Sequence, residues 1–134
     1  MDIKKEKILC QKQWAKNKYL VLSYSSKIYL EIRTYLKQEE VSLEEVDKLI
    51  KQAINLPEDK GQVTNALHHV WGYFKKSATK EEKDNFFEMI EDYHINKTTK
   101  EDLIEEVKKL LKKYPNTYLE QSTFINGGKD ETLA

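Results

Sequence analysis

The sequence has few of the residues that crosslink or interrupt a chain: one cysteine, Cys10, two prolines and four glycines among 134 residues. A single thiol excludes a disulfide within the chain and a zinc site built from several of its own cysteines. A lone thiol is typical of a reducing compartment, so we expect a cytoplasmic protein. The scarcity of proline and glycine leaves long segments that favour helices, and we therefore expect an all-α domain.

Long hydrophobic runs are also absent. Residues 1–14 have no apolar region like that of a signal peptide, and no apolar run approaches the length that spans a membrane, so we expect no membrane partner. Aromatic residues are plentiful, with two Trp, eight Tyr and four Phe. Because each buried ring removes a large apolar area from water, this content argues against a disordered chain.

Opposite charges balance, 23 Lys and Arg against 23 Asp and Glu, but they are separated along the chain. Residues 1–37, 60–76 and 107–115 are rich in lysine, whereas residues 38–59 and 77–106 are rich in acids. Two interpretations remain open. The blocks can form solvated helix faces that pair with one another, or the basic blocks can form a face for an anionic partner.

Apolar residues at helical spacing predict a bundle of five or six helices around one core. The first helix is expected over residues 3–23, where Ile8, Ala15, Tyr19 and Leu22 share a face. Ser25 or Ser26 is expected to begin the second helix. Three further helix starts are indicated by pairs with the spacing of a capping box: Ser42 with Glu45, Thr79 with Glu82, and Thr99 with Asp102.

We assign the helical domain to residues 1–126. The remaining residues, 127–134, contain two glycines and three charged residues, and we expect them to form a flexible tail.

Residues 60–76, KGQVTNALHHVWGYFKK, hold the densest group of chemically capable side chains, on one expected helix. Its core face is predicted from apolar residues at i, i+4, i+7 and i+11: Val63, Leu67, Val70 and Phe74. His68 and His69 are adjacent, so they point about 100° apart and do not share one metal ion. We predict no metal site and no cofactor.

Asn65, His69 and Tyr73 follow one another at four-residue intervals on a neighbouring face of that helix. His69 could act as a general base oriented by Asn65, or the pair could only satisfy a polar helix face. Gly72 lies inside the expected helix, where a glycine is tolerated best if another helix or a ligand approaches closely.

Aromatic and basic residues occur together at two places. Trp71 and Tyr73 lie beside Lys75 and Lys76, and the segment KKLLKK spans residues 108–113. Such groups stack on bases and neutralise phosphates, but they also suit a core face and a helix C-terminus. The candidate nucleic-acid contacts are Trp71, Tyr73, Lys75, Lys76, Lys108, Lys109, Lys112 and Lys113.

Several separated segments resemble the YbgA-like family. Residues 65–75 resemble its N-V-L-x-H-x-x-G-Y-F-[KR] motif, and residues 18–29 resemble K-Y-x-x-x-A-H-S-x-x-x-Y. The likeness continues through Glu82-Lys83, Ile90 to Tyr93, Tyr114-Pro115 and Tyr118 to Gln121, so that it covers roughly residues 11–126.

The resemblance implies a small helical domain of unknown function, which occurs alone or fused to a thiouracil-desulfidase domain. In the fused enzymes the desulfidase part carries the iron–sulfur chemistry, and this domain is thought to help to hold the tRNA. Tyr24, Val63 and Lys109 stand where the family usually has histidines. If those histidines form one site, only His69 and Asn65 remain of it, which favours binding over catalysis.

We therefore predict an RNA-binding accessory protein, directed to tRNA and linked to tRNA thiouridine metabolism. One alternative is a protein-interaction module that docks a partner enzyme, such as a separately encoded desulfidase or another RNA-modification protein. A second alternative is a small enzyme that uses His69 and Asn65.

Overall fold

The computed structural model describes residues 2–127, and α-helix is the only regular secondary structure in that part of the chain. The predicted all-α bundle is confirmed, with two additional single-turn helices near its C-terminal end. The helices are α1 Ile3–Tyr24, α2 Ser26–Tyr35, α3 Leu43–Ile54, α4 Lys60–Trp71, α5 Lys80–His94, α6 Lys100–Lys113, α7 Thr117–Glu120 and α8 Thr123–Asn126. Gly127 ends α8 in the left-handed conformation, and the rest of the expected tail lies outside the described residues.

Helix boundaries in the first part of the chain follow side-chain capping. The Ser25 hydroxyl accepts a hydrogen bond from the Ile28 N–H (3.0 Å) and so separates α1 from α2. The Ser42 hydroxyl accepts from the Glu45 N–H (3.4 Å) at the start of α3. The Ser42 N–H donates to the Tyr35 hydroxyl (2.8 Å), a long-range contact in place of the second half of the predicted capping box.

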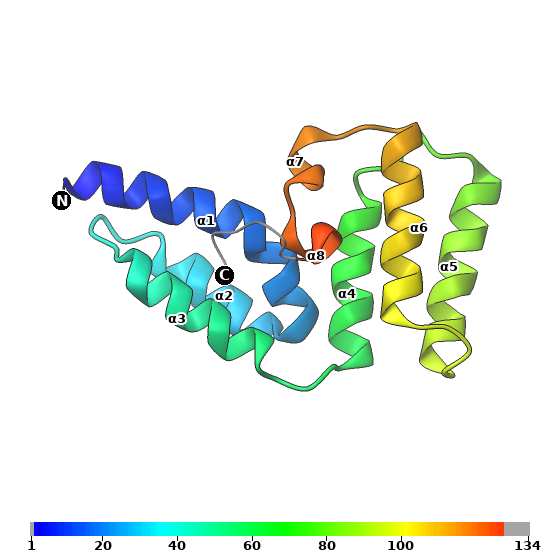
Figure 1. The fold of residues 1–134 in the computed structure, drawn as a ribbon, viewed down its shortest axis with the longest axis horizontal. Helices are drawn as coiled ribbons and strands as arrows, with labels where there is room; N and C mark the ends of the chain where they lie inside the picture. Colours follow the sequence, from blue (N-terminus) through cyan, green and yellow to red (C-terminus); the bar gives the residue numbers. More distant parts are fainter. Residues whose placement is uncertain (1, 128–134) are drawn as a thin grey trace.

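The helices form two lobes (Figure 1), and within residues 2–127 the interior consists of two hydrophobic clusters instead of the single core that was predicted. The smaller cluster joins α1 to α2 and α3 and includes Cys10 and Val21. The larger cluster joins the C-terminal half of α1 to α4, α5, α6, α7 and α8 and includes Tyr19 and Leu22. Helix α1 therefore holds the two lobes together.

The predicted apolar stripe of α1 is buried only at its C-terminal end. Tyr19 and Leu22 are buried, whereas Ile8 is 50 % exposed. In its first half, α1 instead buries Cys10 against the α2–α3 lobe. The expectation that Ile8 faces a core is wrong, because the lobe built by α4 to α6 covers only the second half of α1 (Figure 1).

The helix expected over residues 60–76 is shorter than predicted. Its four predicted core residues are buried, but α4 ends at Trp71, and Gly72 is its C-cap. The next two N–H groups, of Tyr73 and Phe74, donate to carbonyls three residues earlier, as in a 3₁₀ turn. A Cβ on Gly72 would come 3.1 Å from the His69 carbonyl oxygen, so the close neighbour is this helix's own backbone.

Candidate functional site

Tyrosines from three distant segments meet beside the C-terminal end of α4. The hydroxyls of Tyr19 on α1 and Tyr73 are 2.8 Å apart, and their rings meet edge to face. The Tyr73 ring stacks on Tyr118 of α7, with 6.3 Å between centroids and an interplanar angle of 20°. The ammonium nitrogen of Lys18 lies 5.2 Å from the Tyr19 ring centroid and 5.0 Å from that of Tyr118. We call these four residues the tyrosine–lysine cluster.

The cluster buries the Tyr19 phenol and holds its lysine close to two aromatic rings. Burial, followed by the hydrogen bond with Tyr73, raises the pKa of the Tyr19 hydroxyl well above its ordinary value. Two hydroxyls share one hydrogen bond, so one of them retains a proton for a further acceptor. Tyr19 is 8 % exposed and Tyr73 only half-buried, so a further acceptor reaches that proton at Tyr73 when Tyr19 is the donor of the shared bond. The cluster can thus offer a hydroxyl, an ammonium group and ring surface.

Sequence reasoning did not select Lys18, Tyr19 or Tyr118 as site residues. Tyr19 and Tyr73 are separated by 54 positions, and no local pattern reports such a contact. The available signal was the resemblance, because each of the three residues lies in a segment that matches a family motif.

Trp71 belongs to the interior. Its side chain is 6 % exposed, and its ring stacks on Phe86 with 5.2 Å between centroids and an interplanar angle of 19°. Phe74 and Phe87 also contact the ring, at 6.1 and 5.6 Å between centroids. This placement removes Trp71 from the side chains that can stack on a base.

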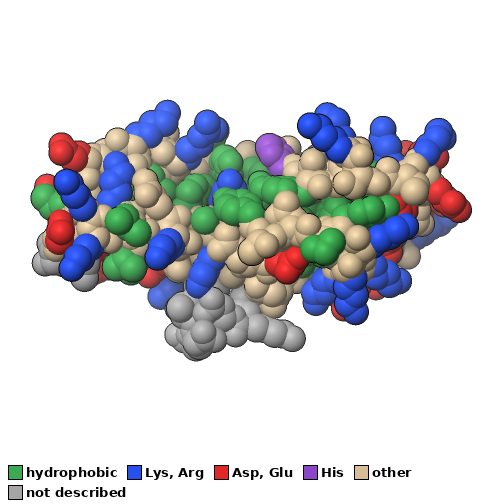
Figure 2. Space-filling view, turned by 90° about the horizontal axis from the view of Figure 1, so that it is seen from above, with side chains coloured by type: hydrophobic (Ala, Val, Ile, Leu, Met, Phe, Trp, Pro, Cys, Tyr) green, Lys and Arg blue, Asp and Glu red, His purple; other side chains and the backbone are tan. Residues whose placement is uncertain are grey.

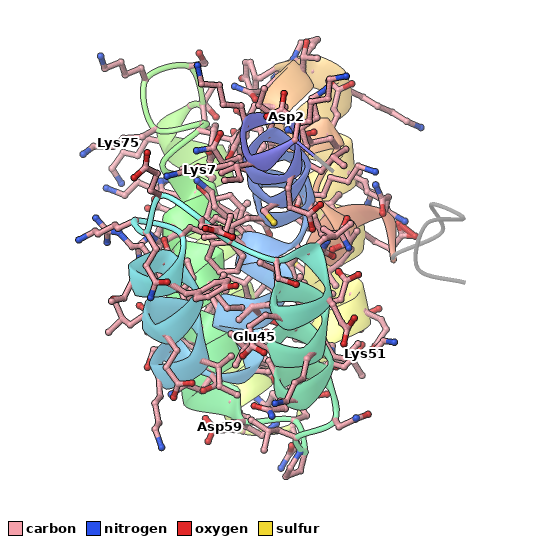
Figure 3. The ribbon with its side chains drawn as sticks, turned by 90° about the vertical axis from the view of Figure 1, so that its left-hand side faces the viewer. Asp2, Lys7, Glu45, Lys51, Asp59 and Lys75 are labelled. Atoms are coloured by element: carbon pink, nitrogen blue, oxygen red, sulfur yellow. The ribbon has the colours of Figure 1, made fainter. Side chains whose placement is uncertain are left out.

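Lys75 and Lys76 are exposed in the segment that connects α4 to α5. No ion pair within residues 2–127 involves either of them. In the view of Figure 3, Lys75 lies toward the same upper side as Lys7 and Asp2 of the α1 start, although at a different depth, whereas Asp59 lies at the lower end. The two lysines thus add positive charge, without an ion pair in the described part of the chain, at two and three residues beyond Tyr73 of the tyrosine–lysine cluster.

The four lysines of residues 108–113 do not share one surface. Lys113 meets Glu82 of α5 (3.0 Å), whereas Lys109 meets Glu106 of its own helix (4.0 Å). Lys108 and Lys112 line a hollow next to α8, and Lys108 also meets Glu105 (3.8 Å). Of the four, only Lys112 has no ion pair within the described residues.

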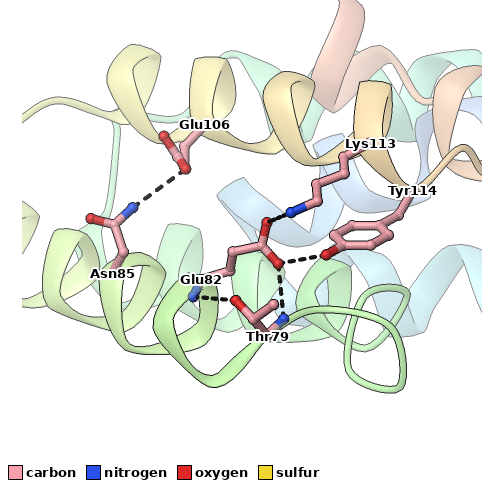
Figure 4. Close-up of polar contacts among 6 residues, drawn as sticks. All are labelled: Thr79, Glu82, Asn85, Glu106, Lys113 and Tyr114. Atoms are coloured by element: carbon pink, nitrogen blue, oxygen red, sulfur yellow. Dashed lines mark hydrogen bonds and ion pairs between the residues drawn. The ribbon is translucent and has the colours of Figure 1, made fainter.

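Glu82 ties the start of α5 to the end of α6 (Figure 4). Its carboxylate accepts hydrogen bonds from the Tyr114 hydroxyl (2.7 Å), the Lys113 ammonium group (3.0 Å) and the Thr79 N–H (2.8 Å). The last of these completes the capping box predicted at Thr79, and the box predicted at Thr99 also forms. The three bonds, that from Tyr114 above all, lower the pKa of Glu82 to about 2.

The lowered pKa of Glu82 predicts an acid-sensitive contribution to stability. The folded value, about 2, is below the ordinary 4.5, so the stabilisation is complete above pH 4.5 and is lost as the pH falls toward 2. In urea unfolding, we expect the wild-type protein to exceed Glu82→Gln in free energy of unfolding by an amount that shrinks over this pH range. Glu88→Gln, at an exposed position of the same helix, is the matched control. A difference that stays constant with pH would contradict the assignment.

The histidines do not form a common site. Asn65 and His69 are both exposed, and within residues 2–127 no hydrogen bond or ring contact joins them. His68 packs edge-on against Phe87, whereas the Nε2 atom of His94 lies 2.9 Å from the Thr64 hydroxyl. No group of three or more His, Cys, Asp or Glu side chains within that range is arranged to hold a metal ion.

A separate hollow of about 390 Å³ lies between α1, α6 and α8. Its apolar lining includes Leu20, Ile104 and Phe124, and Lys100 and Lys108 stand at its edge. The Lys100 ammonium group lies 5.2 Å from the Tyr24 ring centroid and 3.8 Å from Glu58. Because Lys108 also has a carboxylate neighbour, neither lysine offers this hollow an unpaired charge.

The fold and the tyrosine–lysine cluster define a small all-α domain whose central polar cluster combines phenols with an ammonium group. The family model described as a protein of unknown function (DUF1722) matches residues 18–127, and the chain belongs to this family, the YbgA-like family that its motifs resemble. The matched range contains all four residues of the cluster. No curated protein and no solved structure matches the chain. No helix within residues 2–127 is long and apolar enough to cross a membrane.

Proposed function

We propose that this protein binds RNA, with tRNA as the expected ligand, as an accessory in tRNA thiouridine metabolism. The observation that carries the proposal is the tyrosine–lysine cluster with Lys75 and Lys76 beside it. Aromatic side chains that stack on unpaired bases, next to cations that neutralise phosphates, are the usual means by which proteins hold RNA. The link to thiouridine rests on the family resemblance alone.

The distribution of charge on one face of the molecule supports this proposal. Lys and Arg side chains are spread over both lobes on the upper face, with hydrophobic side chains between them (Figure 2). In our proposal Lys75, Lys76 and Lys112 contact phosphates, and Tyr73 and Tyr118 contact a base. Lys108, Lys109 and Lys113 contribute less, because each already has a carboxylate within 4.0 Å.

Binding of labelled tRNA at several salt concentrations tests the proposal. We expect affinity at low salt that falls as salt rises, since binding releases counterions from the phosphates. Replacing Lys75 and Lys76 together by glutamine should reduce the slope of log affinity against log salt by roughly two. The matched control replaces Lys48 and Lys51, two exposed lysines of α3. Absence of binding at low salt, or binding without a salt slope, would rule out the RNA function.

The ion pairs of Lys108, Lys109 and Lys113 favour the alternative of a protein-interaction module, since basic and acidic blocks there neutralise each other. Pull-down with and without nuclease separates the two functions: a desulfidase or RNA-modification enzyme retained after nuclease treatment supports protein docking.

The alternative of a small enzyme depends on His69. It would lose its basis if His69→Ala left every cellular phenotype intact.

A further inference from the structure

The N-terminal half of α1 carries lysines that the rest of the chain does not neutralise. Lys4, Lys5 and Lys12 are exposed, and no ion pair within residues 2–127 involves them. The acid-rich residues 38–59 lie in the same lobe, but the contacts of this segment with α1 do not involve these three lysines. The segment is joined to α1 by three hydrogen bonds: Leu43 N–H to Glu6 (2.8 Å), the Gln13 side chain to Asp47 (3.0 Å), and the Lys7 ammonium group to the Gln38 carbonyl (2.7 Å).

These lysines lie on one side of α1. At about 100° per residue, Lys4, Ile8, Lys12 and Lys5 fall within an arc of about 100°, away from the buried Cys10. Tyr19 falls within the same arc further along the helix, where the second lobe covers it. The lysine arc therefore continues along α1 directly into the tyrosine–lysine cluster.

The chemistry of the arc suits phosphates and does not suit bases. Over residues 4–12 it presents ammonium groups and one aliphatic side chain, Ile8, but no aromatic or arginine side chain that could stack on a base. A base-paired RNA stem is contacted mainly through its phosphates and 2′-hydroxyls, whereas unpaired bases are held by stacking. The distance from Lys4 to Lys12 along the helix is roughly 12 Å, so the arc can contact more than one phosphate.

We propose that α1 forms the second half of the RNA interface: Lys4, Lys5 and Lys12 bind the phosphates of a base-paired stem, while the tyrosine–lysine cluster holds the unpaired bases that adjoin it. The preferred ligand is thus a stem–loop RNA. This inference rests on the proposed RNA function and adds to it the class of RNA and the helix that contacts the phosphates of the stem.

Two RNA probes test this inference: a stem–loop, and an unpaired oligonucleotide with the sequence of the loop. Lys5→Gln combined with Lys12→Gln should weaken binding of the stem–loop and reduce its salt slope by roughly two, while binding of the oligonucleotide stays unchanged. Lys48→Gln with Lys51→Gln removes the same charge from α3 and should leave both affinities unchanged. Circular dichroism checks that each variant folds.

The outcomes distinguish this inference from the function on which it rests. If the wild-type protein binds the stem–loop and the Lys5→Gln, Lys12→Gln variant binds it with the same affinity and salt slope, the inference is overturned but RNA binding stands. Wild-type protein that binds neither probe at low salt overturns both. If the wild-type protein binds vesicles containing anionic lipid and the α1 variant does not, while both bind RNA equally, the lysine arc belongs to a membrane surface and the inference is overturned.

Discussion

Replacing Trp71 by alanine is expected to lower the free energy of unfolding by about 3–5 kcal/mol, the usual cost of deleting a buried aromatic ring. The ring is 6 % exposed and stacks on Phe86 in the larger hydrophobic cluster. Alanine would leave a cavity lined by rings that close packing prevents from collapsing fully. Urea unfolding followed by circular dichroism measures the loss.

Trp14, the second tryptophan, provides a matched control. Its ring is half-buried and contacts Tyr29 at 5.3 Å between centroids, so Trp14→Ala should cost less than Trp71→Ala. A Trp71→Ala variant with wild-type stability and no RNA binding would place Trp71 on the binding surface, contrary to the packing described above. A destabilised variant that still binds tRNA at low temperature would agree with that packing.

The helix starts were predictable from sequence because capping is local. Thr79 and Thr99 lie three residues before the carboxylates that complete their capping boxes, and both boxes form. The second half of the box predicted at Ser42 does not form, because the Ser42 N–H donates to the Tyr35 hydroxyl of α2, a contact that no local pattern indicates. Similarly, periodicity identified the stripe through Ile8 and Tyr19, but only the tertiary arrangement determines which half of it is covered.

The candidate site was predicted in part. Tyr73, Lys75 and Lys76 were selected from one segment; Tyr73 belongs to the tyrosine–lysine cluster, and the two lysines follow it by two and three residues. Lys18 and Tyr118 were missed because their meeting depends on the packing of α7 against α1. The separation of Lys108 from Lys109, by contrast, follows from helix geometry alone, since adjacent residues point about 100° apart. The RNA ligand, its link to thiouridine and the cytoplasmic location remain predictions.

The meeting of Lys18 with Tyr118 depends on how the C-terminal segment is held on α1. The Thr123 hydroxyl at the start of α8 donates to the Asn17 side-chain oxygen (2.7 Å), and it lies 3.2 Å from the Lys16 carbonyl oxygen. Asn17 and Thr123 are each 1 % exposed, and 106 positions separate them. Asn17 is next to Lys18 in α1, and α8 follows α7, which carries Tyr118, after two residues. We therefore expect this buried hydrogen bond to hold Lys18 and Tyr118 in position against each other.

A double-mutant cycle tests this role. Asn17→Leu should cost about 1–3 kcal/mol in free energy of unfolding, since it leaves the buried Thr123 hydroxyl without its nearer acceptor, and Thr123→Val should cost a similar amount. The double variant should cost less than the two single changes combined, because replacing both partners by apolar groups of similar shape removes the unsatisfied polar atoms. Thr117→Val, at an exposed position of α7, should change stability by no more than about 0.5 kcal/mol. Additive single costs would show that the two side chains act independently, and the position of Tyr118 against Lys18 would then have to come from the apolar packing of α8 alone.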